Sequence, residues 1–298
     1  MKPVPVDVGD AADIYAVDVE MFGVERYGAV FVVDADRPAV IDTGTGANVE
    51  GLIDALGSLG IAPEDLQIIA PTHVHLDHAG GAGYLARECP NADLYVHERG
   101  ARHLIDPERL WEGTKRAVPD WVDHYAEPLP VPQKRVVEIS EGDSIDLGSR
   151  KLAVIDAPGH APHQAVFDDP ESDCIFVADA AGLYVEEFAR PRPTTPPPNF
   201  DLSQCQADIE RLRELDRSGF LFPHCGAAPA AELLNGYAAE LDLWVETVEA
   251  AIDDAGTDDV AGIVDELDVW SDAAAVWGEQ HVRETQALNV RGVLARSD

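Results

Sequence analysis

One loop carries an unusual density of metal-ligand side chains. Residues 66–70 predict a strand, and the next helix is expected to begin around residues 80–85, so residues 72–78 lie in a strand-to-helix loop. Packing does not require four such groups there. Imidazole and carboxylate ligands without a thiolate suit Zn, Fe(II) or Mn. The loop therefore predicts a metal site in which one ion uses the first pair of ligands and a second ion the other pair; the four residues are His73, His75, Asp77 and His78.

The same residue types recur after three later predicted strands. His160 follows a strand over residues 151–156, Asp179 follows one over 174–177, and His224 follows one over 219–222. Each histidine alone would be explained better as a polar residue with local partners. As a set they all come just after strands, and loops at strand ends can converge on one site.

The predicted elements indicate an α/β fold with two sheets and a helical tail. Strands over 14–19, 29–33 and 39–41 predict an antiparallel opening sheet, and strands over 136–139, 151–156, 165–167 and 174–177 predict a second sheet. A helix is expected from residue 48 and a helical stretch over 99–112. Helical spacing from residue 230 onward divides the chain into a catalytic domain, residues 1–228, and a helical extension, residues 229–298.

The charge of the chain excludes some partners. Its 56 acidic residues face 21 basic ones, which gives a net charge of -35. Such self-repulsion is typical of proteins adapted to concentrated salt, as in halophilic archaea. An acidic surface for a basic partner would predict clustered acidic blocks, whereas these residues are spread along the chain. Nucleic acid is not an expected partner, because no basic patch is present.

Cysteine usage and hydropathy favour the cytoplasm. The four cysteines form no CxxC pair and no disulfide framework, which is typical of reduced thiols. The sequence has neither a signal-peptide pattern nor an uncharged apolar run of 18 residues. A membrane is therefore not an expected partner.

Five motifs in order resemble the metallo-β-lactamase superfamily, in the manner of glyoxalase-II-like hydrolases. The resemblance covers roughly residues 14–226 and implies a four-layer αββα sandwich with metals at one edge. Its motifs are Ile-Asp-Thr-Gly at 41–44, Thr-His-Val-His-Leu-Asp-His-Ala-Gly-Gly at 72–81, Ala-Pro-Gly-His at 157–160, Ala-Asp at 178–179 and Pro-His at 223–224.

The resemblance also implies a ligand set for two divalent ions, with zinc preferred and iron or manganese as alternatives. The first ion would be held by His73, His75 and His160, the second by Asp77, His78 and His224, and Asp179 would bridge them. Asp42 either orients a ligand of the metal loop or forms a turn before Gly44.

The activity implied is hydrolysis of a small-molecule thioester or related acyl ester by a hydroxide that bridges the two metals. Asp77 is expected to act catalytically as well, by returning a proton to the leaving group. The alternatives are a lactonase, a phosphodiesterase or an iron-dependent oxidoreductase that resembles persulfide dioxygenases. A non-catalytic scaffold would require a defective ligand set, and none of the seven positions is missing.

Several features leave alternatives open. Where many family members have Pro-Gly-His-Thr-x-Gly-His, Gln164 replaces the second histidine and His163 is additional. Cys225 beside His224 is expected to pack away from the metals.

The proline-rich segment 190–200 predicts a lid or rim loop, or an inert connection. Its arginines, Arg190 and Arg192, either clamp an anionic substrate or pair with carboxylates. The C-terminal helices are a possible homodimer interface.

Overall fold

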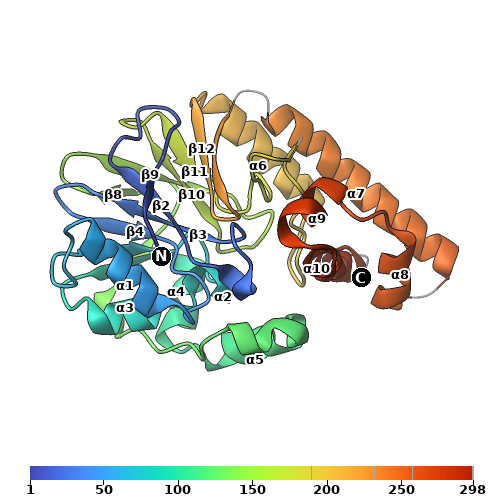
Figure 1. Cartoon of the computed structure of the whole chain (residues 1–298), viewed down its shortest axis with the longest axis horizontal. Helices are drawn as coiled ribbons and strands as arrows, with labels where there is room; N and C mark the ends of the chain where they lie inside the picture. The colour runs from blue at the N-terminus through green and yellow to red at the C-terminus, as the bar shows by residue number, and fades with distance from the viewer. Residues whose placement is uncertain (189, 231–232, 257, 297–298) are drawn as a thin grey trace.

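Two β-sheets form the centre of the molecule (Figure 1). The computed structural model describes residues 1–188, 190–230, 233–256 and 258–296. The first sheet has the strand order β1 (Val4–Pro5), β2 (Ile14–Asp18), β3 (Ala29–Val33), β4 (Ala39–Ile41), β5 (Ile68–Ala70), β6 (Asp93–His97) and β7 (Val136–Ile139). The second has the order β13 (Gly226–Pro229), β12 (Gly219–Phe222), β11 (Cys174–Phe176), β10 (Ala165–Asp169), β9 (Lys151–Asp156) and β8 (Ser144–Asp146).

Strand pairing confirms one expectation about the sheets and corrects another. Strands β1 to β4 pair antiparallel, as predicted for the opening sheet. Strand β7 was expected in the second sheet, but it pairs parallel with β6 in the first, with Leu94 opposite Val136. That prediction was wrong because the strand pattern gives no pairing partner, and the helices between β6 and β7 provide the crossover that a parallel pair needs.

Successive side chains of a strand point to opposite faces of its sheet, so an inner strand can contact both the other sheet and the outer helices. In β3, Phe31 faces the second sheet and its ring meets Phe176 of β11 edge-on at 5.6 Å. Its neighbours Val30 and Val32 belong instead to the buried cluster that contains Leu52 of α1 (Val49–Ser58). A strand buried on both faces must lie between a sheet and helices. The predicted α/β class and αββα sandwich are confirmed.

The helices outside the sheets differ in detail from the prediction. Figure 1 places α1, α3 (Ala82–Glu88) and α4 (Glu98–Ile105) beside the first sheet, and α6 (Leu202–Glu214) beside the second. The stretch expected over 99–112 is two helices, α4 and α5 (Glu108–Ala117). The break falls before Pro107, because proline disfavours helical geometry in the residue that precedes it.

Four helices follow the second sheet: α7 (Leu233–Ala255), α8 (Val260–Glu266), α9 (Ser271–Trp277) and α10 (Glu279–Arg296). Helix α10 packs against each of the other three. The domain division at 228/229 remains a prediction, and β13 runs across that position. Among the helices of the described ranges, none is both long and apolar enough to span a bilayer.

The net charge of -35 leads to the first testable prediction. We expect the melting temperature to rise by about 10 °C between 0.1 M and 2 M KCl, because salt screens repulsion among surface carboxylates. Differential scanning calorimetry across a KCl series measures the change. Sucrose at matched osmolality serves as the control, because it is excluded from the surface without screening charge. A melting temperature that is flat or falls with KCl would contradict adaptation to high salt.

Candidate metal centre

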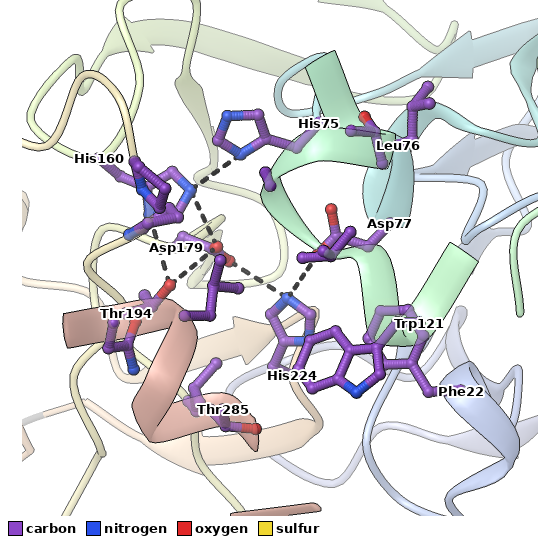
Figure 2. A pocket seen from close by; sticks show the side chains of 18 of the residues that line it. Phe22, His75, Leu76, Asp77, Trp121, His160, Asp179, Thr194, His224 and Thr285 are labelled. Carbon is purple, nitrogen blue, oxygen red and sulfur yellow. Dashed lines mark hydrogen bonds and ion pairs between the residues drawn. The ribbon is translucent and has the colours of Figure 1, made fainter. Parts of the chain in front are cut away.

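The predicted ligands come from four segments of the chain and lie together in one cluster. Figure 2 shows His75, Asp77, His160, Asp179 and His224 pointing toward one another. His73 follows β5, His160 follows β9, Asp179 follows β11 and His224 follows β12. The segment predicted as a loop after β5 contains a short helix, α2 (Leu76–Ala79). That helix begins directly after His75 and carries Asp77 and His78, so the prediction of an entirely irregular loop was wrong.

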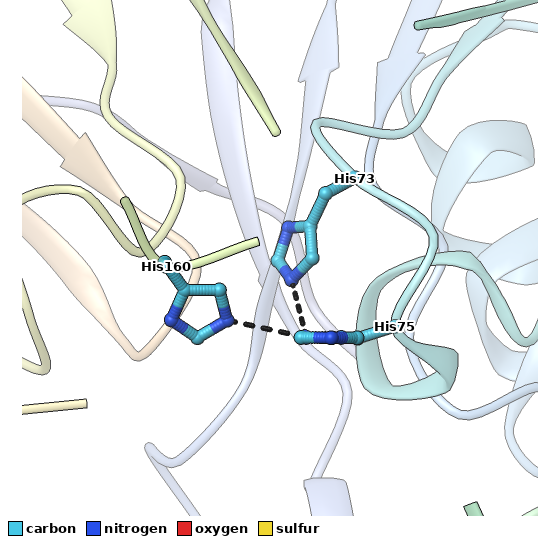
Figure 3. Close-up of side chains that lie close together, drawn as sticks. All are labelled: His73, His75 and His160. Atoms are coloured by element: carbon cyan, nitrogen blue, oxygen red, sulfur yellow. Dashed lines mark hydrogen bonds between the residues drawn. The ribbon is translucent and has the colours of Figure 1, made fainter. Parts of the chain in front are cut away.

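Three imidazoles form the first ligand group (Figure 3). The Nδ1 atom of His75 lies 3.0 Å from Nε2 of His73 and 3.1 Å from Nε2 of His160. The ligand atoms of a tetrahedral zinc ion, bound at about 2.0–2.1 Å, lie about 3.3 Å apart. The three nitrogens therefore fit around a single ion of that size.

A second group lies beside the first. The Nε2 atoms of His78 and His224 are 3.2 Å apart, and each lies 3.6 Å from Oδ2 of Asp77. The group combines two imidazoles with a carboxylate, which is a ligand set typical of a hard or borderline divalent ion.

Asp179 lies between the two groups. Its Oδ2 is 3.2 Å from Nε2 of His160, whereas its Oδ1 is 3.6 Å from Nε2 of His78 and 3.7 Å from Nε2 of His224. The buried Oδ1 has no hydrogen-bond partner among the described residues. A buried carboxylate oxygen without a donor is costly unless a cation satisfies it. Asp179 thus fits the bridging position that the family resemblance implies.

The electrostatics of the cluster favour binding of cations. Burial lowers the pKa of His75 to about 3 and lowers that of His73 well below its ordinary value, so both imidazoles are neutral at pH 7. Burial also lowers the pKa of His78, but the carboxylates of Asp77, Asp179 and Asp42 outweigh burial and raise it to about 10. The attraction that retains a proton on His78 would also favour a divalent ion.

Asp179 is ionised despite its environment. Burial raises its pKa, but the imidazoles around it, His160 first, lower it to about 2. Neutral imidazole and ionised carboxylate are the forms that bind metals.

Asp42 supports the metal loop. Its carboxylate accepts hydrogen bonds from the backbone N–H of Thr72 at 2.8 Å and from Nδ1 of His78 at 3.1 Å. When a bound ion displaces the proton from Nε2 of His78, this bond would keep the other proton on Nδ1 and hold Nε2 toward the second ligand group. These contacts favour the orienting role over the simple turn, although Asp42 also has a positive φ of 61° before Gly44.

The family model for the metallo-beta-lactamase superfamily matches residues 24–224, which is more than half of the chain. The chain belongs to the metallo-beta-lactamase superfamily. This result confirms the resemblance drawn from the five motifs. Residues 24–224 include all seven predicted ligands, whose role in binding metal stays a prediction.

Two curated relatives and one solved structure illustrate the relationship. Acyl-coenzyme A thioesterase MBLAC2 of Gallus gallus is 32% identical over 159 residues, which cover 49% of this chain and 54% of the thioesterase. The metallo-beta-lactamase fold-containing protein ST1585 of Sulfurisphaera tokodaii is 28% identical over 190 residues, or 61% of this chain and 70% of that protein. The crystal structure of ST1585 superposes with a TM-score of 0.72 at 20% identity and covers 96% of this chain and 98% of its own.

These likenesses differ in what they establish. The match to ST1585 at 20% identity shows a shared fold. The chain spans about half the length of the thioesterase. The match therefore does not by itself assign the activity of the thioesterase to this chain.

Two supporting residues were not anticipated from the sequence. The backbone carbonyl of Tyr27 accepts a hydrogen bond from Nδ1 of His224 at 3.1 Å and orients that imidazole. The hydroxyl of Thr194 lies 3.4 Å from Oδ2 of Asp179 and 3.5 Å from Nδ1 of His160. A backbone carbonyl carries no residue-type signal, and a threonine between prolines matches no superfamily motif noted in the sequence.

The departures from the family motif have structural roles. Gln164 accepts a hydrogen bond from the backbone N–H of Asp179 at 3.2 Å and donates to the carbonyl of Ala157 at 2.9 Å. It thereby joins the loops of two predicted ligands. Nδ1 of His163 accepts the backbone N–H of Val74 at 3.4 Å, so this additional histidine braces the metal loop.

Cys225 packs as expected. It contacts both buried hydrophobic clusters and belongs to none of the ligand groups found among the described residues. Burial raises the pKa of its thiol to about 12, which keeps the thiolate scarce at neutral pH.

The proline-rich segment forms one wall of a pocket above the ligands. Thr194, Pro196 and Pro197 line that pocket, which agrees with the predicted rim position and not with an inert connection. The anion clamp predicted as one alternative is wrong. Arg190 pairs with Glu240 at 2.8 Å, and Arg192 pairs with Glu240 and with Asp272. With the carboxylates holding both guanidinium groups, pairing is the alternative that the structure supports.

The rest of the pocket is mainly apolar. Figure 2 shows Trp121 and Phe22 side by side next to His224, and their rings stack at 4.6 Å. Tyr125, Leu288 and Pro196 also line the pocket. Among the described residues that line the pocket, none is lysine or arginine. The pocket therefore offers an apolar surface to the part of a substrate that lies beside the ligand cluster.

Proposed function

We propose that the chain is a metal-dependent hydrolase that cleaves thioesters of apolar acyl groups. The observation that carries the proposal is a buried cluster of two ligand groups that opens into an apolar, aromatic pocket without cationic side chains. The relationship to an acyl-coenzyme A thioesterase supports the same class of substrate.

The two ligand groups would hold the ions as the sequence predicts, with Asp179 between them. Zinc is the preferred ion, because five imidazoles and two carboxylates without a thiolate match its usual ligands. Bound divalent ions lower the pKa of water toward neutrality and polarise a substrate carbonyl. Three separate contacts, made by Asp42, Tyr27 and Thr194, each orient the imidazole of a different predicted ligand. The ligands therefore need little rearrangement to bind the ions.

The apolar lining of the pocket would favour substrates with apolar acyl groups. An acyl chain would pack against Trp121, Phe22 and Pro196, which all line the pocket. Each buried methylene contributes about 0.8 kcal/mol. A phosphodiester would bring negative charge next to carboxylates with no lysine or arginine from the described lining residues, which disfavours that alternative.

Asp77 is placed to act on the leaving group. Its side chain is 24% exposed and lines the pocket, whereas the neighbouring His78 is only 1% exposed. A carboxyl group at this position can exchange a proton with the departing thiol or alcohol while the acyl chain stays against the aromatic wall.

A substrate panel tests the proposed function. Protein purified in high salt is analysed for bound metals and assayed with thioesters, lactones and phosphodiesters of matched size. We expect two metal ions per chain and the highest kcat/KM for thioesters, with values that rise with acyl chain length. Higher activity on phosphodiesters, or metal content near zero in protein that also fails to bind added Zn²⁺, would overturn the proposal.

The pocket variant Trp121→Ala isolates the role of the aromatic wall. We expect kcat/KM for long acyl chains to fall by roughly 10–100-fold and that for acetyl thioesters to fall much less, because a long chain loses more buried contact when the ring is removed. The control is Trp111→Ala, because Trp111 lies on α5 near Lys115 and does not line the pocket. Equal losses for short and long chains would show that the wall does not bind the acyl group.

A further inference from the structure

We propose that helix α10 positions the metal centre through Asn289, which fixes Thr194 between two of the predicted ligands. This inference rests on the proposed metal binding by His160 and Asp179. It gives the C-terminal helices a role in the site itself, because Asn289 lies 94 residues beyond Thr195, one of its partners.

The side chain of Asn289 holds the backbone on both sides of Thr194. Its Nδ2 donates to the carbonyl of Pro193 at 2.9 Å, and its Oδ1 accepts the backbone N–H of Thr195 at 2.7 Å. The Thr195 hydroxyl in turn donates to the backbone carbonyl of Asn289 at 3.0 Å. Asn289 is 2% exposed, so each of these bonds is protected from water.

Close packing of α10 on the same segment maintains these contacts. A Cβ atom on Gly292 would lie only 1.7 Å from the carbonyl oxygen of Thr195, so glycine allows the helix to approach the chain there. Nε1 of Trp244, from α7, donates to the Thr195 hydroxyl at 3.2 Å. Proline cannot donate a backbone hydrogen bond, so these outside contacts fix the position of the segment against the helices.

Thr194 in turn contacts two of the predicted ligands. Its hydroxyl donates toward Oδ2 of Asp179 at 3.4 Å and lies 3.5 Å from Nδ1 of His160. A proton held on Nδ1 of His160 leaves its Nε2 unprotonated toward His75 and Asp179.

The contacts therefore connect Asn289, through the backbone on both sides of Thr194, to the Thr194 hydroxyl, and that hydroxyl to two predicted ligands, His160 and Asp179. Removing either the Asn289 amide or the Thr194 hydroxyl should loosen the same ligands. Residues that act through a single connection show non-additive effects when both are changed.

The test measures metal binding and does not depend on substrate. The affinity for Zn²⁺ is determined by competition with a chromophoric chelator in Asn289→Ala, Thr194→Val and the double variant, and the Co²⁺-substituted proteins are compared by visible absorption. We expect each single variant to raise the Kd of the weakened site about tenfold. The double variant should show about the same tenfold loss, and all three should share one altered Co²⁺ spectrum.

Two further variants complete the comparison. Thr194→Ser keeps the hydroxyl and should restore the affinity and spectrum of the unmodified protein. Gln286→Ala removes another buried amide of α10, which donates to the carbonyl of Asp268 at 3.0 Å. It reports general loosening of the helix and should leave both the affinity and the spectrum unchanged.

The inference is overturned if Asn289→Ala lowers thermal stability but keeps the unmodified Zn²⁺ affinity and Co²⁺ spectrum. It is also overturned if the losses of the two single variants multiply to about a hundredfold in the double variant. Failure of the proposed function would be seen separately, as absence of metal binding in the unmodified protein or absence of hydrolysis by its metal-loaded form.

Discussion

Replacement of Asp179 by asparagine is expected to lower kcat/KM by about a thousandfold and to reduce the bound metal from two ions to about one per chain. The two oxygens of this carboxylate face different ligand groups, Oδ2 toward His160 and Oδ1 toward His78 and His224. Asparagine has nearly the same shape but no charge, and its amide nitrogen cannot ligate a cation. Steady-state kinetics and elemental analysis of the same preparation measure both effects.

A buried carboxylate that belongs to none of the ligand groups provides the control. Asp168 is 5% exposed and pairs with Arg217, whose Nε lies 2.6 Å from its Oδ1. Asp168→Asn should destabilise the protein, because it leaves a cation without its partner, but should keep two metal ions and nearly the original turnover. If Asp179→Asn retained two ions and lost less than about tenfold in rate, Asp179 would not be the bridging residue.

The candidate ligands could be selected from the sequence because their signal is local. Each ligand follows a strand with a clear hydrophobic pattern, and the residue types themselves indicate the chemistry. The positions of strands such as β3 and β4 follow from alternation and flanking turns in the same way. The structure brings these residues together as metal-ligand groups, with His73, His75 and His160 as one of them.

Features that depend on contacts between distant residues could not be predicted. The sheet to which β7 belongs is decided by its pairing with β6, which the pattern of residues 136–139 does not encode. The support that Tyr27 gives to His224 comes from a backbone carbonyl, which any residue possesses. Asn289 resembles an ordinary polar residue of a helix until its contact with Pro193 and Thr195 is known.

The same reasoning explains why the proline-rich segment was ambiguous. Its composition predicts stiffness but not the surface against which it packs. In the structure its arginines pair with Glu240 and Asp272. Thr194, which follows the arginines in the chain, lines the pocket beside the ligands. Within one segment, the arginines thus contact the helical tail, whereas Thr194 contacts the site.

Replacement of Asp77 by asparagine, at saturating Zn²⁺ so that metal occupancy is equal, is expected to lower kcat by roughly 100–1000-fold on oxygen esters. The loss should be smaller on thioesters. An alkoxide needs a proton as it departs, whereas a thiolate, with a pKa of about 8.5 for a free cysteine thiol, leaves more readily without one. Parallel kinetics on an ester and a thioester with the same acyl group compare the two leaving groups directly.

Asp77→Glu provides the matched variant, because it keeps the carboxyl group while shifting its position. Partial recovery of the ester rate with glutamate, together with the leaving-group dependence of the asparagine variant, distinguishes proton transfer from metal ligation alone. A ligand that only holds metal would produce equal losses on both substrates, because both depend on the same ions. Unchanged turnover in Asp77→Asn would dismiss the proton-transfer role, and the exposed position of this carboxylate, beside the buried His78 and His224, would then reflect metal binding only.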